Sequence, residues 1–289
     1  MMQNLFRLII LSSFVSLSAH AFPTIGSTQN FSAQLSKMQE SQAFTTNYDF
    51  EGIVALSNCS GSLIQLEGGS NSEKALILTN GHCFEGGFAK PGEYVFGRPS
   101  NRTFTILDSK AGSLGKVTAT EVVYSTMTGT DITIYKLRET YADILAKFGT
   151  NPLTLSSNHP VAGDDMEVIS GYWRRGYSCS VEAFVPQLRE DAWTMTDSIR
   201  YSRPGCETIG GTSGSPITKA GTKIVIGINN TGNEDGQKCT MNNPCEVDAL
   251  GNITFTKGVS YGQQTYQIYS CLNTARELDL TVQGCLLTH

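Results

Sequence analysis

Short apolar runs separated by turn residues fill the sequence from Gly52 onward. Most runs are rich in β-branched or aromatic residues, and several are followed closely by Gly or Asn. Runs of this length and spacing are typical of a β-sandwich or β-barrel protein. The expected strands are 53–56, 62–66, 74–79, 93–96, 103–107, 117–124, 131–137, 166–171, 180–185, 193–196, 223–229 and 265–269. After Gly52, helical patterns are limited to the short segments 140–148 and 273–278. We therefore expect an all-β fold with a short C-terminal helix.

The composition narrows the classes of function. The 289 residues include 21 Lys and Arg against 26 Asp and Glu, a net charge of -5, and 39% of them are hydrophobic. An intrinsically disordered chain would carry more charge and fewer apolar residues. A general nucleic-acid binder would present a net basic face, so nucleic acid is not an expected partner. The length suffices for one large all-β domain or two small ones.

The first 21 residues have the pattern of a secretory signal peptide. Met1–Arg7 carry one positive charge, Leu8–Ser18 form an apolar run, and Ala19-His20-Ala21 offers a small-x-small cleavage site. The apolar run is shorter than the roughly 20 residues that a membrane-spanning helix needs. We therefore expect a secreted protein that has no membrane contact after the signal is removed.

Residues 22–47 differ from the sequence that follows because they are rich in Ser, Gln and Thr. We expect a propeptide or a surface-lying N-terminal arm, with an ordinary first element of the domain as the alternative. Residues 48–289 are then the functional domain.

Eight cysteines indicate disulfides, because paired thiols persist in the oxidising compartments that secreted proteins reach. A metal site is not expected, since the sequence has no C-x-x-C motif and its four histidines are scattered.

Three segments together carry a catalytic pattern. Leu78–Cys83 contains a histidine after an apolar strand, Thr130–Leu137 places an acid at the head of an alternating strand, and Gly210–Ile217 reads GGTSGSPI. In the order His, Asp, Ser, they resemble the chymotrypsin-like (trypsin-fold) serine peptidases, with the G-x-S-G-S-P motif of the bacterial-type branch. The resemblance runs from about Gly52 to the C-terminal region. It implies two six-stranded antiparallel β-barrels with the catalytic groups in the cleft between them.

The resemblance also implies a role for each residue. Ser213 would attack the scissile carbonyl to form an acyl-enzyme, with His82 as general base and then general acid. Asp131 would hold the tautomer of His82 and stabilise its charged form. The backbone N–H groups of Gly211 and Ser213 would form the oxyanion hole. This chemistry needs no cofactor, so we expect none.

In the resembled family, a disulfide between the positions of Cys59 and Cys83 ties the strand before the histidine to the histidine loop. For the other six cysteines the sequence leaves alternatives open. These are Cys271 with Cys285 near the C-terminus, and either Cys179 with Cys206 or Cys206 with Cys239, the second choice leaving Cys179 for Cys245.

Thr212 departs from the trypsin-type pattern. Trypsin-type zymogens have an Asp before the nucleophile, and this Asp binds the new N-terminal ammonium group after activation cleavage. A neutral Thr212 cannot form that ion pair. We therefore expect a preformed oxyanion loop before Ser213, with any propeptide acting as a steric cover.

Three residues are candidates for substrate binding. Glu207 lies six residues before Ser213, where a trypsin-like peptidase keeps the acid of its S1 pocket and selects Arg or Lys. However, the stretch from Cys206 to Ser213 is longer than the usual cysteine-to-serine interval of the family, so the alternative is an exposed loop acid at Glu207. Asn229 and Asn230 are expected in the pocket wall, where the backbone would pair with an extended substrate. Glutamate-selective relatives have His in this wall, so Asn229 argues against that specificity.

The combined prediction is a secreted, monomeric serine endopeptidase whose partners are polypeptide substrates and protein inhibitors. The first alternative is a catalytically silent relative that uses the fold for binding. A serine esterase or lipase ranks lower, because those enzymes usually carry Ser on a G-x-S-x-G elbow with the histidine last in the chain.

Overall fold

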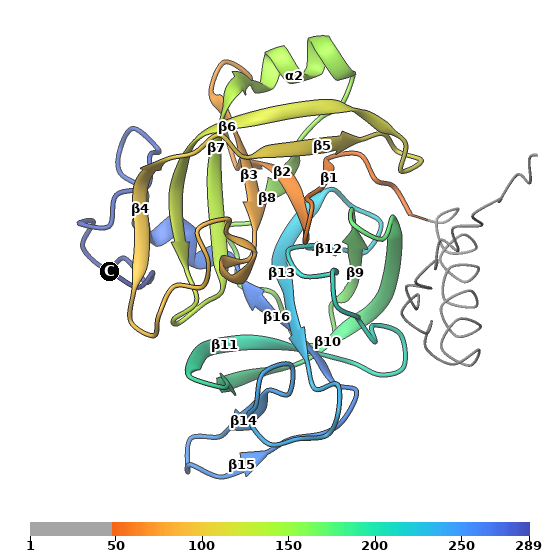
Figure 1. The fold of residues 1–289 in the computed structure, drawn as a ribbon, viewed down its shortest axis with the longest axis vertical. Helices are drawn as coiled ribbons and strands as arrows, with labels where there is room; N and C mark the ends of the chain where they lie inside the picture. Colours follow the sequence, from red (N-terminus) through yellow and green to blue (C-terminus); the bar gives the residue numbers. More distant parts are fainter. Residues whose placement is uncertain (1–47) are drawn as a thin grey trace, which may run out of the picture. The chain divides into compact units, whose positions relative to one another are not determined.

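The structure is a computed structural model that describes residues 48–289, so the predicted signal peptide and the segment 22–47 lie outside the described residues. Six antiparallel strands close into a first barrel, because β1 pairs with both β2 and β5 (Figure 1). In ring order the strands are β1 (Ile53–Ala55), β5 (Thr103–Leu107), β6 (Ser113–Thr126), β7 (Ile132–Thr140), β3 (Lys74–Thr79) and β2 (Ser60–Leu66). Outside the ring, β4 (Tyr94–Pro99) pairs with β6.

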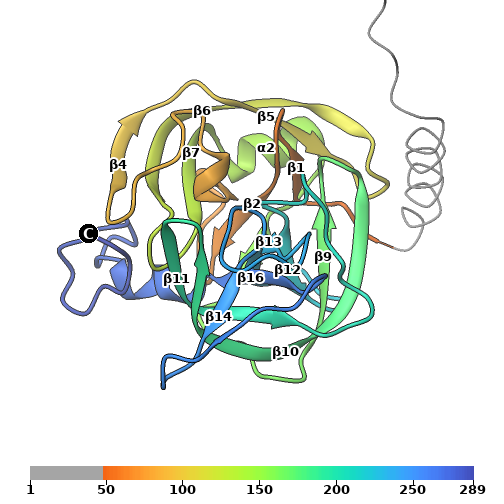
Figure 2. The same cartoon turned by 60° about the horizontal axis from the view of Figure 1, so that its bottom comes forward.

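Six later strands close into a second antiparallel barrel, because β13 pairs with both β12 and β16. Figure 2 shows the long β10 with β9 towards one end and β11 towards the other. In ring order the strands are β13 (Ile224–Gly232), β12 (Pro216–Lys219), β9 (Asp165–Ser170), β10 (Arg175–Glu190), β11 (Trp193–Tyr201) and β16 (Ser260–Gln264). Two short strands lie outside this ring: β14 (Cys245–Val247) pairs with β10, and β15 (Ile253–Thr254) pairs with β14.

Strand β8 (Leu153–Leu155) joins the two barrels by pairing in parallel with β2 of the first and β13 of the second. The two barrels share an apolar core at this junction. It includes Ile64 of β2, Leu155 of β8 and Ile228 of β13, which are all essentially buried. Removal of this apolar surface from water holds the barrels together. The all-β double-barrel fold expected from the sequence is confirmed.

Each barrel also has its own core. Strand pairing places Leu63, Ile77 and Tyr135 side by side across β2, β3 and β7, and all three side chains are fully buried. In the second barrel, Ile217 of β12 pairs with Val168 of β9, and both are fully buried. The short apolar runs of the sequence therefore fill two separate barrel interiors.

The helical segments agree with the sequence at one position and differ at another. As expected, α2 (Tyr141–Phe148) is a helix, and Thr140 caps it through a capping box with Asp143. The strand expected at 265–269 is wrong, because these residues lead into the 3-10 helix η2 (Tyr266–Cys271). The helix expected at 273–278 is a turn, so η2 is the short helix near the C-terminus.

Four disulfides link the eight cysteines. The pair implied by the resemblance, Cys59–Cys83, is present. Of the open alternatives the structure has Cys179–Cys206, Cys239–Cys245 and Cys271–Cys285. Within residues 48–289, no helix has the length and apolar character needed to cross a membrane.

Candidate active site

His82 lies in the 3-10 turn η1 (Gly81–Cys83), just after the buried strand β3 ends. The turn approaches the first barrel closely at Gly81. A Cβ atom at this position would collide with the carbonyl of Thr126 and lie 2.8 Å from Oδ1 of Asp131. The glycine before the histidine therefore lets the turn pack directly beside Asp131.

Asp131 precedes β7 and holds His82 through two hydrogen bonds. Its Oδ2 lies 2.7 Å from Nδ1 of His82, and its Oδ1 accepts the backbone N–H of His82 over 3.0 Å. The side chain of Asp131 is 4% exposed, against 22% for that of His82. Asn80 fixes the acid in turn by donating its side-chain amide to the Asp131 carbonyl over 2.8 Å. The carboxylate is thus buried and the imidazole is partly open to the cavity.

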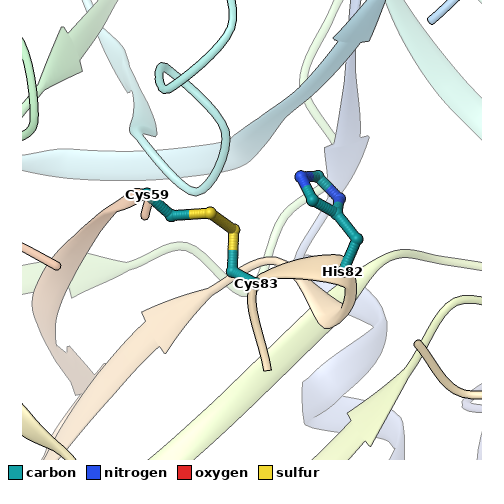
Figure 3. Close-up of side chains that lie close together, drawn as sticks. All are labelled: Cys59, His82 and Cys83. Atoms are coloured by element: carbon teal, nitrogen blue, oxygen red, sulfur yellow. A yellow bond between two sulfur atoms is a disulfide. The ribbon is translucent and has the colours of Figure 1, made fainter. Parts of the chain in front are cut away.

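The Cys59–Cys83 disulfide lies beside this histidine, as Figure 3 shows. Ligand atoms of Cys59, Cys83 and His82 lie within 4.8 Å of one another, a spacing that could hold a metal ion. However, the two sulfur atoms are bonded to each other, and a metal-binding cysteine needs a free thiolate. These three residues therefore do not fit a metal site.

Charged neighbours raise the pKa of His82 above its ordinary value. Burial by itself would lower this pKa, but the negative charge of Asp131, the hydrogen bond to it and the charge of Glu190 outweigh burial. Glu190 is the last residue of β10. Burial raises the pKa of its carboxyl, although the backbone N–H of Asn242 donates a hydrogen bond to this carboxyl over 2.7 Å, which lowers the pKa. The site therefore favours the protonated imidazole more than water does.

Ser213 lies in the loop between β11 and β12 and lines the same cavity of about 100 Å³ as His82 and Asp131. Its hydroxyl donates to the carbonyl of Asn230 over 3.3 Å. Among the described residues, no hydrogen bond joins Ser213 to His82. The structure brings the three predicted catalytic residues to one cavity, with the serine hydroxyl turned to Asn230.

The turn before Ser213 has all its carbonyl groups engaged. Five consecutive carbonyls, from Ile209 to Ser213, accept hydrogen bonds from protein donors. The donors, in order, are Thr212, the Trp173 indole, the Ser60 hydroxyl, the Ser215 N–H and the Ser60 N–H. No described residue accepts a hydrogen bond from the backbone N–H of Gly211 or from that of Ser213. This segment thus has free donors and no free acceptor, the polarity that a developing oxyanion needs.

The three candidate substrate-binding residues lie in different surroundings. Asn230 lines the cavity and is 4% exposed. Asn229 is buried behind the cavity, where it bonds to Tyr201 and Thr212. Glu207 is exposed and does not line the cavity, and its carboxylate accepts the N–H of Gly205 over 3.1 Å. These surroundings agree with the option of an exposed loop acid and give no support to the S1 role of Glu207.

Sequence reasoning missed the wall that the β10–β11 hairpin and the loop after η1 contribute to the cavity. Phe88 lies edge-on to His82 with ring centroids 6.2 Å apart, and Trp193 lies edge-on to Phe88 at 5.7 Å. Glu190 and Glu234 add two acids to the lining. Local signals could not identify these residues, because the hairpin returns to the histidine loop only in the folded barrels.

Comparison with known protein families identifies the family of this chain. The family model described as the trypsin-like peptidase domain matches residues 59–228, more than half of the chain. No curated protein matches this chain. The apo protease domain of MamO from Magnetospirillum magneticum is similar in structure, with 13% identity and a TM-score of 0.48, covering 79% of this chain and 99% of that chain.

Two further solved structures are similar at lower TM-scores. The thermostable serine protease AL20 from an extremophilic microorganism has 16% identity and a TM-score of 0.42, covering 75% of this chain and 92% of its own. The chymotrypsin of Cellulomonas bogoriensis has 15% identity and a TM-score of 0.39, covering 75% of this chain and 90% of its own. The family match spans His82, Asp131 and Ser213. On this match the chain belongs to the trypsin-like peptidase domain family.

Proposed function

We propose that the protein is a serine endopeptidase that uses His82, Asp131 and Ser213 as its catalytic triad. One observation carries the proposal: a buried carboxylate holds Nδ1 of His82 at 2.7 Å in the cavity that Ser213 also lines. An acid bound to Nδ1 leaves Nε2 as the nitrogen that can accept the proton of an attacking hydroxyl.

In the proposed mechanism, the Ser213 hydroxyl turns from the Asn230 carbonyl toward Nε2 of His82 when substrate binds. Catalytic hydrogen bonds are often long in the free enzyme and tighten in the complex. Ser213 Oγ bonds to the scissile carbonyl carbon while its proton passes to His82. The protonated His82 then gives this proton to the leaving amine, and water hydrolyses the acyl-enzyme by the same route.

The N–H groups of Gly211 and Ser213 would stabilise the negative oxygen of the tetrahedral intermediate. Their freedom from protein acceptors supports this role, because a hydrogen-bond donor already in use could not respond to the developing charge.

We also propose secretion, with residues 1–21 as the signal and residues 22–47 as a propeptide or arm. Four disulfides support an oxidising compartment. The proposed substrates are polypeptides, which would pair in an extended conformation with the backbone next to Asn230.

The test is cleavage of an unfolded protein, followed by mass spectrometry of the peptides. Wild-type protein should produce defined peptide ends, whereas Ser213→Ala should leave the substrate intact. Intact substrate with both proteins would contradict the proposal. It would favour the silent binding relative, which the hydrogen bond from Ser213 to Asn230 in place of His82 also supports. Hydrolysis of small esters without peptide cleavage would favour an esterase.

A further inference from the structure

A chain of neutral hydrogen bonds holds the turn before Ser213 from the inside of the second barrel. The Tyr201 hydroxyl donates to Oδ1 of Asn229 over 3.0 Å, and Nδ2 of Asn229 donates to Oγ1 of Thr212 over 3.2 Å. The Thr212 hydroxyl donates to the Ile209 carbonyl over 2.5 Å, and the Thr212 N–H donates to the same oxygen over 3.0 Å. The chain thus connects β11 and β13 to both ends of the turn.

Losing one of these hydrogen bonds is costly because the groups that form them are buried. Tyr201 is 0% exposed, and Asn229 and Thr212 are each 1% exposed. Water cannot replace a partner at such depth, so loss of one group leaves another buried polar group unpaired. Burial also raises the pKa of Tyr201 well above its ordinary value, which keeps its hydroxyl protonated as the first donor of the chain.

The Trp173 indole holds the same turn from the outside. Its Nε1–H donates to the carbonyl of Gly210 over 2.7 Å, and a Cβ atom on Gly211 would lie 2.8 Å from Nε1. The C=O and N–H of a trans peptide point in opposite directions. Because the carbonyl of the Gly210–Gly211 peptide points to Trp173, the N–H of Gly211 points away from it.

We propose that Tyr201, Asn229, Thr212 and Trp173 are positioning residues that keep the oxyanion turn formed without an ion pair. The inference rests on the proposed peptidase function and adds how its oxyanion hole is held. An Asp at the position of Thr212 would need a cation, such as a newly formed N-terminus. The neutral chain needs none, so the turn forms independently of any cleavage in the N-terminal segment.

The first test removes the hydroxyl of Thr212 and keeps its shape, in the variant Thr212→Val. Thr222 provides a matched control, because its hydroxyl and N–H bond to the Lys219 carbonyl over 2.7 and 3.0 Å in the same three-residue arrangement, on the exposed turn between β12 and β13. We expect kcat to fall about 10- to 100-fold in Thr212→Val, as for a small misplacement of catalytic groups, with KM changed less than about threefold. Thr212→Ser, which restores a hydroxyl, should regain most of this loss.

A second measurement separates positioning from general stability. A peptide boronic acid forms a tetrahedral adduct on an active serine, and a boronate oxygen occupies the oxyanion hole. Its affinity should fall in Thr212→Val by about the factor lost from kcat, while a product peptide should bind as it does to the wild type. Trp173→Phe removes the indole donor and keeps an aromatic ring. This variant should also bind the boronate more weakly and the product peptide as the wild type does. Tyr172→Phe, in which an adjacent tyrosine loses its hydroxyl, serves as its control.

Three outcomes would overturn the inference while the wild type is active: Thr212→Val matching Thr222→Val in kcat, a rise in KM alone, or unchanged boronate affinity. If the wild type itself cleaves nothing, the proposed function fails, and amide hydrogen exchange still tests the turn. The bonded N–H groups of Thr212 and Gly214 should exchange faster in Thr212→Val than in Thr222→Val. Equal exchange would overturn the inference independently of activity.

Discussion

His82 and Asp131, which line the same cavity, form a short hydrogen bond of 2.7 Å, and the backbone N–H of His82 adds a second bond of 3.0 Å to the same carboxylate. This pairing fixes both the ring orientation and the position of the turn that carries it. The proposed catalysis depends on it, because Nε2 must stay unprotonated and directed at Ser213.

Replacement of the acid by its amide tests this dependence. In Asp131→Asn we expect kcat to fall about 10⁴-fold, because an amide can stabilise the wrong tautomer of His82, while KM changes little. Steady-state cleavage of a fluorogenic peptide gives both constants. A loss of less than tenfold would show that Asp131 does not hold the base.

The pH dependence follows from the raised pKa of His82. The unprotonated imidazole is the base, and its fraction falls as the pH drops through this pKa. Because Asp131 and Glu190 raise the pKa, kcat/KM should begin to fall at a pH above the ordinary histidine value of about 6.5. A pH profile of kcat/KM measures this limb, and a midpoint clearly below 6.5 would contradict the account.

Glu190, which lines the same cavity, supplies part of this shift. In Glu190→Gln the negative charge is lost, so the pKa of His82 should fall and the acid limb should move to lower pH. Glu234→Gln is the matched control, since Glu234 also lines the cavity but is not among the groups that raise this pKa. Equal limbs in both variants would remove the assigned role of Glu190.

The disulfide beside His82 should contribute more stability than a short-loop disulfide. Replacing Cys59 and Cys83 by Ser frees a loop with a sequence separation of 24, against 6 for the pair Cys239–Cys245. Loop-closure entropy predicts costs of about 3.5 and about 2.3 kcal/mol, respectively. Thermal unfolding of the two double variants should therefore show the lower Tm for the Cys59/Cys83 variant, and the reverse order would contradict the expectation.

The sequence predicted those parts of the fold that depend on local pattern. Short apolar runs separated by turn residues indicated most strands, and His82, Asp131 and Ser213 each lie in a short motif close to the end of a strand. The segment 265–269 misled because its residues alternate, yet Ile268 and Cys271 are buried three positions apart, which matches a 3-10 helix.

Other parts of the site depend on tertiary structure. Spacing from Ser213 suggested Glu207 for the pocket, but the loop between Cys206 and the turn carries that side chain to the surface. Glu190 and Trp193 reach the cavity because the long β10–β11 hairpin folds back toward His82. No local pattern in either segment encodes that approach.

Labelling with a fluorophosphonate probe tests the central claim most directly, because the probe reacts with a serine that a neighbouring base has activated. Wild-type protein should be labelled at Ser213, and both Ser213→Ala and His82→Ala should abolish labelling while keeping the Tm of the wild type within a few degrees. Absence of labelling in folded wild-type protein from which residues 1–47 have been removed would contradict the active-peptidase account.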